Sequence, residues 1–213
     1  MAETVQDSNE NPLPQAERAY RVLERMIVTL KLQPGETLTE GALIERVGLG
    51  RTPVREAVQR LAWEGLLNVR PRSGIEIAPL EPADFPKVLA ARRGVEALLA
   101  WGAASYASPE HDILFRKVEK DMLSAAAKKN VDAVLDADKA FDAVLGQASA
   151  NPYAARLAAP LQTHSRRVWF RRQRPDSLQL AAERHAALID AIVARDADKA
   201  EQAAHDLIDH LGR

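Results

Sequence analysis

The stretch GLGRTPVREAVQRLAWEGLLNVRPRSG, residues 48–74, decides how the first part of this chain folds. Thr52 is a good N-cap residue, Pro53 falls at the first helical position, and Gly65 suits a left-handed helix end. We therefore predict a helix between them. The apolar residues that share one face of this helix are Val54, Val58 and Leu61. The stretch thus predicts a helix that packs one face into a small core and leaves the other in solvent.

Two further helices and a hairpin are predicted around this helix. Apolar residues recur at helical spacing from residue 15 to 30, and the proline and glycine of 33–36 end that helix. Thr39 is the expected N-cap of a second helix that runs to about Val47. After Gly65, LLNVR and IEIAPL predict two short strands joined by PRSG. Three helices followed by a β-hairpin predict a winged helix-turn-helix over residues 15–80.

The exposed positions of this unit are basic. Between residues 51 and 72 there are five arginines against two glutamates, although the whole chain has a net charge of −1. The residues expected to contact duplex DNA are Arg51, Thr52, Arg55, Gln59, Arg70, Arg72, Ser73 and Gly74. A guanidinium can bind guanine O6 and N7 together, and the free N–H groups of a helix N-terminus attract phosphates. The alternative is an ordinary solvated face, with Glu56 and Arg60 as an i,i+4 ion pair.

The composition changes after EPADFP, residues 81–86, whose two prolines predict a linker. Beyond it the chain is rich in alanine and has almost no strand signal. Six helices are predicted there, over 83–106, 109–129, 131–149, 152–173, 177–194 and 196–211. We therefore expect a mainly α fold, with an all-helical domain over 87–213 and a flexible tail over 1–14.

Several classes of protein are disfavoured by what the sequence lacks. There is no run of about eighteen apolar residues to cross a membrane, and the acidic N-terminus does not resemble a signal peptide. The chain has no cysteine, which fits a reducing cytoplasm and excludes thiolate metal sites. It also has no G-x-S-x-G or H-E-x-x-H motif and no phosphate-binding glycine loop. A binding protein is therefore favoured over an enzyme.

The string RTPVREAVQRLAWEGLL followed by PRSG resembles the winged-helix domain of the GntR family of bacterial transcription regulators. The resemblance implies that the DNA-contacting positions of the helix and the wing are Arg51, Thr52, Arg55, Arg72, Ser73 and Gly74. Some members carry a further DNA-contacting arginine early in the second helix, where this chain has EGAL. The resemblance therefore implies fewer or different contacts from that helix.

The second part of the chain is similar to the FadR-like (FCD-type) effector domain of that family, an antiparallel helical bundle around a ligand cavity. The strings that carry the similarity are AARRGVEALLAWGAA, DADKAFDAVLGQASANP and ERHAALIDAIVARDADKAEQAAHDLIDHL. Many such domains hold a divalent metal through one aspartate and three histidines. Asp138 and His185 match two of these positions, whereas Asp142 and Leu207 stand where the pattern has histidine. Two carboxylates and one imidazole would suit Mg²⁺, Mn²⁺ or Ca²⁺ better than Zn²⁺, with Ni²⁺ as a further candidate.

Two alternatives to a metal site remain open. In one, Asp138 and Asp142 are solvated helix residues and His185 is a buried polar group. In the other, an arginine binds an organic acid directly, and Arg92 is the candidate. The basic run RRVWFRRQR, residues 166–174, is expected to be a solvated face or helix end, although it could supply a guanidinium to a carboxylate ligand.

Together these features predict a ligand-responsive bacterial transcription regulator, expected to be a repressor. A homodimer would place two recognition helices on a short inverted-repeat operator in double-stranded DNA. A small-molecule effector, expected to be a carboxylate, would bind in the helical domain and bias the arrangement of the two heads. We expect a cytoplasmic protein that associates with the nucleoid when bound and does not enter a membrane. The alternative functions are a metal-dependent enzyme and a helical protein-interaction scaffold.

Overall fold

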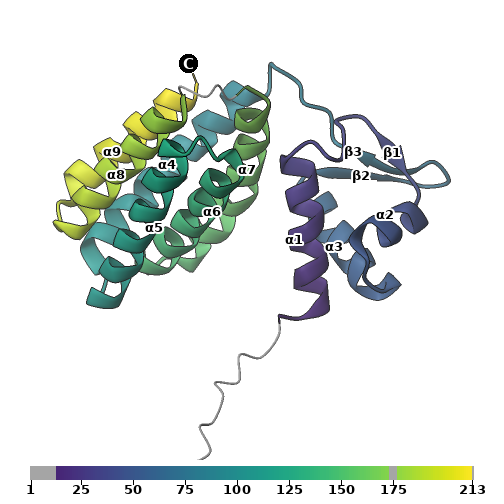
Figure 1. Ribbon diagram of the computed structural model, residues 1–213, viewed down its shortest axis with the longest axis horizontal. Helices are drawn as coiled ribbons and strands as arrows, with labels where there is room; N and C mark the ends of the chain where they lie inside the picture. Colours follow the sequence, from purple (N-terminus) through teal and green to yellow (C-terminus); the bar gives the residue numbers. More distant parts are fainter. Residues whose placement is uncertain (1–12, 173–176, 213) are drawn as a thin grey trace, which may run out of the picture. The chain divides into compact units, whose positions relative to one another are not determined.

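The computed structural model describes residues 13–172 and 177–212, which form nine helices and one three-stranded sheet (Figure 1). The chain divides into two compact units, one of residues 13–27 and Lys31–Ala78, the other of Val28–Leu30 and the residues from Pro79 onward. We call them the head and the body. The mainly α fold expected from the sequence is confirmed. The expected tail over 1–14 lies, as far as residue 12, outside the described residues.

The head is the predicted winged helix-turn-helix with one extra strand. Its elements are α1 (Gln15–Val28), β1 (Thr37–Leu38), α2 (Glu40–Val47), α3 (Arg51–Trp63), β2 (Leu67–Arg70) and β3 (Gly74–Ile77). The sheet has the order β1-β3-β2 and is antiparallel throughout, with Leu38 opposite Ile75. The two-residue strand β1 was not predicted, because so short a segment shows no alternation of polar and apolar residues.

The three helices of the head pack around one apolar core. Its fully buried side chains include Leu23, Ile27, Leu43, Val54, Leu61 and Ile77. Thr39 caps α2 as predicted, since its hydroxyl accepts a hydrogen bond from the Ala42 amide at 3.1 Å.

The start of α3 differs from the prediction by two residues. The N-cap is Gly50 rather than Thr52, because Gly50 already has the extended backbone (φ −63°, ψ 164°) that precedes a helix. Arg51 is therefore the first helical residue. At the other end Gly65 has a left-handed φ of +77°, as its position after the helix predicted.

Gly74, at the start of β3, is needed for a close approach inside the head. Its φ is +107°, and a Cβ at this position would lie 2.7 Å from the backbone oxygen of Leu38. Only glycine fits against strand β1 there without a shift of the backbone. Gly74 was predicted as one of the residues that contact DNA, and the structure shows this further reason for a glycine there.

The body is an all-α bundle. Its helices are α4 (Phe85–Tyr106), α5 (Pro109–Ala127), α6 (Val131–Ala148), α7 (Pro152–Arg172), α8 (Ser177–Val193) and α9 (Ala197–Leu211). The predicted helices agree with these bounds to within about two residues at each end, which is the usual precision of helix boundaries. The predicted end of α7 at residue 173 lies outside the described residues.

Helix α4 packs against α6, α7, α8 and α9, and α5 packs against α6 and α8. The largest buried side chains of the shared core include Leu99, Phe115 and Phe141. This packing brings α6, α7 and α8 together around the polar centre described below.

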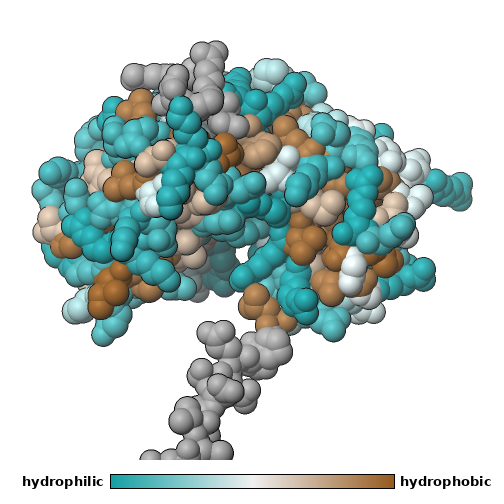
Figure 2. Space-filling model, in the orientation of Figure 1, coloured by the Kyte–Doolittle hydropathy of each residue, from teal (hydrophilic) through white to brown (hydrophobic). Residues whose placement is uncertain are grey.

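The surface shown in Figure 2 is mainly hydrophilic, with hydrophobic residues in separate patches. Within residues 13–172 and 177–212, no helix combines the length and the apolar character that crossing a membrane requires.

Candidate functional site

Helix α3 presents its polar side to solvent. Val54, Ala57, Val58 and Leu61 are buried, whereas Arg51, Thr52, Arg55 and Gln59 are exposed. The side chains of Arg51 and Arg55 keep 70% and 56% of their surface in solvent. The structure therefore shows the apolar face and the basic face that the sequence predicts for this helix.

Glu40, the first residue of α2, contacts both arginines of this face. Its Oε2 accepts a hydrogen bond from Arg55 Nε at 2.8 Å, and its Oε1 lies 3.4 Å from Arg51 Nε. One carboxylate therefore holds two guanidinium groups beside each other at the start of α3. The role of Glu40, the first residue of EGAL, was not predicted, because only the fold brings it beside Arg51 and Arg55.

The tip of the β2–β3 hairpin carries the other predicted contacts. Arg70 pairs with Glu76 on the neighbouring strand at 2.7 Å, and the Ser73 amide donates to the Arg70 carbonyl at 3.1 Å. Arg72 is exposed and has a left-handed φ of +66°, which is uncommon for a residue other than glycine. The turn therefore holds Arg72 out at the tip.

Arg60, on the other side of α3, has a structural role. Its guanidinium lies 3.6 Å from the centre of the Tyr20 ring and contacts Glu17 and Glu64. Tyr20 in turn donates to Glu64 at 2.8 Å. The alternative pair of Glu56 with Arg60 was wrong, because these contacts hold Arg60 against α1.

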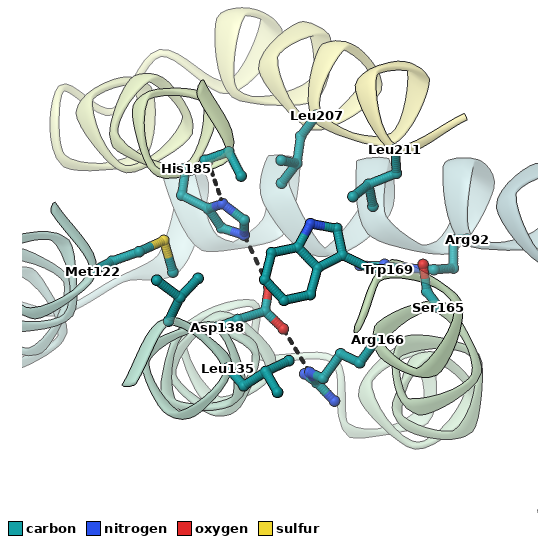
Figure 3. A pocket seen from close by; sticks show the side chains of 12 residues that line it. Arg92, Met122, Leu135, Asp138, Ser165, Arg166, Trp169, His185, Leu207 and Leu211 are labelled. Carbon is teal, nitrogen blue, oxygen red and sulfur yellow. Dashed lines mark hydrogen bonds and ion pairs between the residues drawn. The ribbon is translucent and has the colours of Figure 1, made fainter. Parts of the chain in front are cut away.

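The body contains a cavity lined by side chains of all six helices, α4 to α9 (Figure 3). Its volume is about 30 Å³, enough for one or two water molecules. The lining residues are Arg92, Met122, Val134, Leu135, Asp138, Ser165, Arg166, Trp169, Ala181, His185, Leu207 and Leu211. Most of the lining side chains are thus apolar, and the ionisable ones are Arg92, Asp138, Arg166 and His185.

Three of the predicted site residues meet here, but an arginine lies among them. Arg166 Nε donates to Asp138 Oδ2 at 2.5 Å, and Arg166 Nη2 donates to Asp142 Oδ2. On its other side, Asp138 Oδ1 lies 3.2 Å from His185 Nε2, so Asp138 lies between His185 and Arg166 in Figure 3. The interpretation of Asp138 and Asp142 as solvated helix residues was wrong, whereas His185 is the buried polar group of that alternative.

Both ring nitrogens of His185 face oxygen atoms that accept hydrogen bonds. Nδ1 lies 2.8 Å from the carbonyl oxygen of Ala181, and Nε2 faces the Asp138 carboxylate. These two acceptors favour the doubly protonated ring, in which each nitrogen donates a hydrogen bond. Burial lowers the pKa of His185, but the hydrogen bond and the charge of Asp138 outweigh burial and leave this pKa above its ordinary value.

The two carboxyl groups have different pKa values. Burial would raise the pKa of Asp138, but Arg166 and His185 outweigh it and hold this pKa well below its ordinary value. Burial raises the pKa of Asp142 to about 8, against the influence of Arg166, and the nearby carboxylates of Asp138 and Glu96 add to the rise. The ionised form of Asp142 therefore depends strongly on Arg166.

These residues do not fit a divalent metal. The described part of the chain contains no group of three or more His, Cys, Asp or Glu residues placed to hold one ion. The guanidinium of Arg166 lies against both carboxylates, and Leu207 lines the cavity where the metal-binding pattern has histidine. The metal interpretation of Asp138, Asp142 and His185 is therefore not supported by their surroundings.

Arg92, the candidate for binding an effector, is buried and paired. Its Nη2 donates to Glu96 Oε1 at 2.9 Å, and the same oxygen accepts a hydrogen bond from Gln162 at 2.9 Å. Ser165 lines the same cavity and is 1% exposed, and its hydroxyl has no hydrogen-bond partner among the described residues. Ser165 thus leaves a buried polar atom available to a ligand.

The basic run over 166–174 is not simply a solvated face. Arg166 and Arg167 are buried, whereas Arg171 and Arg172 are exposed. The remaining residues of the run, 173 and 174, lie outside the described residues. Arg166 was not singled out, because a helical basic run gives no sign of which residue faces carboxylates on another helix.

Comparison with known proteins decides the family. The model of the bacterial regulatory proteins of the gntR family matches residues 15–77, and the FCD domain model matches residues 87–210, more than half of the chain. The chain belongs to the GntR family. It is a transcription regulator with an FCD domain, so the resemblance is confirmed and the enzyme alternative is wrong.

Individual GntR proteins resemble the chain over most of its length. The HTH-type transcriptional repressor RspR of Escherichia coli is 26% identical and aligns over 89% of this chain and 84% of its own. The galactonate operon transcriptional repressor of the same organism is 27% identical, over 92% and 94%. The structure of E. coli McbR/YncC has the same fold, with a TM-score of 0.81, 18% identity and coverage of 92% and 94%.

Proposed function

We propose that this GntR regulator is a repressor that binds a short inverted repeat as a homodimer and responds to a small organic acid in its body. The proposed division is a DNA-binding head over 15–80, a linker over 81–86 and an effector-binding and dimerisation domain over 87–213. The bound regulator would be associated with the nucleoid in the cytoplasm. The names of RspR and the galactonate regulator as repressors support the direction of control.

The basic face of α3 carries the DNA-binding part of the proposal. Arg51 and Arg55 lie at the helix N-terminus, where the free N–H groups and the helix dipole also favour phosphates. Thr52 and Gln59 extend this face, and Arg70, Arg72, Ser73 and Gly74 belong to the wing. In a homodimer the two α3 helices would enter successive major grooves, about 34 Å apart.

The effector part rests on the cavity of the body. Arg92, Arg166 and Ser165 supply donors for a carboxylate, and the apolar lining suits a short hydrocarbon part. A cavity of about 30 Å³ is too small for such a ligand, so binding would require the lining helices to move. This movement is the step that would alter the affinity for DNA.

The DNA-binding face is tested by replacing its two central arginines. Operators are first selected from a random duplex library with the full chain, and affinities are then measured at physiological salt. Arg51→Ala combined with Arg55→Ala should weaken operator binding at least about thirtyfold, since each base-reading arginine contributes about 1–3 kcal/mol. Lys117→Ala combined with Lys120→Ala removes the same charge from exposed positions on α5 and should change little. Operator binding that survives the arginine changes would disprove this mode of recognition.

The effector site is tested by thermal shift with a panel of small carboxylic acids. Ser165→Ala should leave the melting temperature of the free protein nearly unchanged, because its hydroxyl bonds to nothing in the described residues. The same change should lower the affinity for the stabilising acid about threefold to tenfold, because the acid loses one hydrogen bond. An acid whose affinity is unaffected by Ser165→Ala does not bind as proposed.

A further inference from the structure

The polar centre of the body is held together by one side chain. Asp138 and Asp142 lie one turn apart on α6 and face Arg166 of α7, and Asp138 also contacts His185 of α8. The exposed fractions of the Arg166 and Asp142 side chains are only 9% and 8%. Carboxylates buried to this extent destabilise a fold unless a cation and hydrogen bonds balance them.

A cation can balance two such carboxylates in two ways. A divalent ion can bind between them, or an arginine can place its planar group of donors against both. In this chain Arg166 Nε donates a hydrogen bond to Asp138, and Nη2 donates one to Asp142. One guanidinium therefore connects α7 to two residues of α6. His185, held through Nδ1 by the Ala181 carbonyl, extends the same network to α8.

We propose that Arg166 is the resident cation of this centre and takes the place of a divalent ion, so that the body is stable without metal. The guanidinium occupies the position that a divalent ion would need. A divalent ion must approach carboxylate oxygens to about 2.0–2.6 Å, and here those oxygens already face a fixed positive charge. Leu207 lines the same cavity with an apolar side chain, which cannot complete a ligand set.

The proposal separates this chain from regulators whose helical domains depend on metal. Each of its carboxylates is held by a side chain that cannot be removed by a chelator. Any effector would then contact protein groups only. One such group is the Ser165 hydroxyl, which lines the cavity and has no hydrogen-bond partner among the described residues. That last consequence depends on the proposed function, whereas the role of Arg166 does not.

The test uses the full chain without DNA or effector, so its result is independent of the proposed function. Arg166→Met keeps much of the volume of the side chain but removes its charge. Arg171→Met makes the same change at an exposed position of α7 and is the matched control. Melting temperatures and bound metal are measured with EDTA and with Mn²⁺ in oxygen-free buffer at about pH 8.5, where ionised carboxylates are favoured.

The wild type and Arg171→Met should melt at the same temperature in EDTA and in Mn²⁺ and should retain no stoichiometric metal. Arg166→Met should melt at a clearly lower temperature in EDTA, and Mn²⁺ should restore part of the loss, because it can enter the space that the guanidinium leaves. One equivalent of Mn²⁺ bound to the wild type would overturn the proposal. So would an Arg166→Met protein as stable in EDTA as the control.

A second variant decides the matter if Arg166→Met does not fold. Arg166→Met combined with Asp142→Asn removes the cation together with one of the carboxylates that it balances, while Asp138 keeps its contact with His185. This protein should fold in EDTA and should not respond to Mn²⁺. If it also fails to fold, the charge of Arg166 is not what the centre requires, and the proposal is wrong.

Discussion

At the scale of single residues, the chemistry of this protein lies in carboxylates that hold arginines in place. Glu40 does this in the head for Arg51 and Arg55, and Asp138 and Asp142 do it in the body for Arg166. The two cases differ in burial. The pairs of Glu40 are exposed and contribute little to stability, whereas those of Arg166 lie inside the bundle, where losing one partner is costly.

Glu40 should therefore affect DNA binding more than folding. Its carboxylate repels phosphates and also fixes the direction of two arginines. Glu40→Gln should strengthen binding to random-sequence duplexes about twofold to fivefold, since an exposed ion pair is worth up to about 1 kcal/mol. The ratio of operator affinity to random-duplex affinity should fall, because the arginines lose their orientation.

Fluorescence anisotropy at several salt concentrations measures both quantities. Glu45→Gln is the control, because it removes the same charge from an exposed position on the same helix. It should leave the ratio of operator affinity to random-duplex affinity unchanged. If Glu40→Gln lowers affinity for every duplex alike, the carboxylate supports the fold of the head rather than the direction of the arginines.

At the scale of elements, the body depends on one close contact between helices. A Cβ on Gly102 of α4 would lie 2.7 Å from the backbone oxygen of Ser149, at the end of α6. Backbone cannot move away as a flexible side chain can, so α4 and α6 must separate if Gly102 gains a methyl group. This contact sets the spacing of the helices around the polar centre.

Gly102→Ala should destabilise the body by about 1–3 kcal/mol, as overpacking of a close contact does. Gly94→Ala is the matched control, because Gly94 lies on the same helix with no atom within 4 Å of its added Cβ. That change should stabilise the helix by up to about 1 kcal/mol, since alanine is the better helix former. Urea denaturation followed by circular dichroism measures both, and equal effects of the two changes would contradict the close contact.

At the scale of the whole molecule, the proposed homodimer can be tested through the wing. Each phosphate contact contributes about −0.9 to the slope of log affinity against log salt. Arg72→Asn removes the guanidinium but keeps a residue that tolerates the left-handed φ of +66° at this position. The slope should therefore become less steep by about two units if two heads bind the operator.

Sedimentation of Arg72→Asn alongside the wild type provides the control, because the assembly itself should not change. A loss of about one unit would indicate that a single head engages the DNA. No change in slope would mean that Arg72 does not contact a phosphate.

The sequence by itself determined the order and type of the elements. Helices are local structures, so their caps and apolar spacing can be recognised in the sequence. Thr39 at the start of α2 and Gly65 after α3 are examples of such end signals. The string from Arg51 to Gly74 likewise identified the family, and its basic residues lie on the exposed face that their spacing predicted.

Only the tertiary structure decided which charged groups meet. Arg166 lies 28 residues from Asp138 along the chain, and Glu40 lies 15 residues from Arg55. Neither distance corresponds to a local period, so no pattern could pair them. The carboxylates matched a metal site by spacing on α6, but helix packing placed a guanidinium against them, and this contact determines the chemistry of the centre.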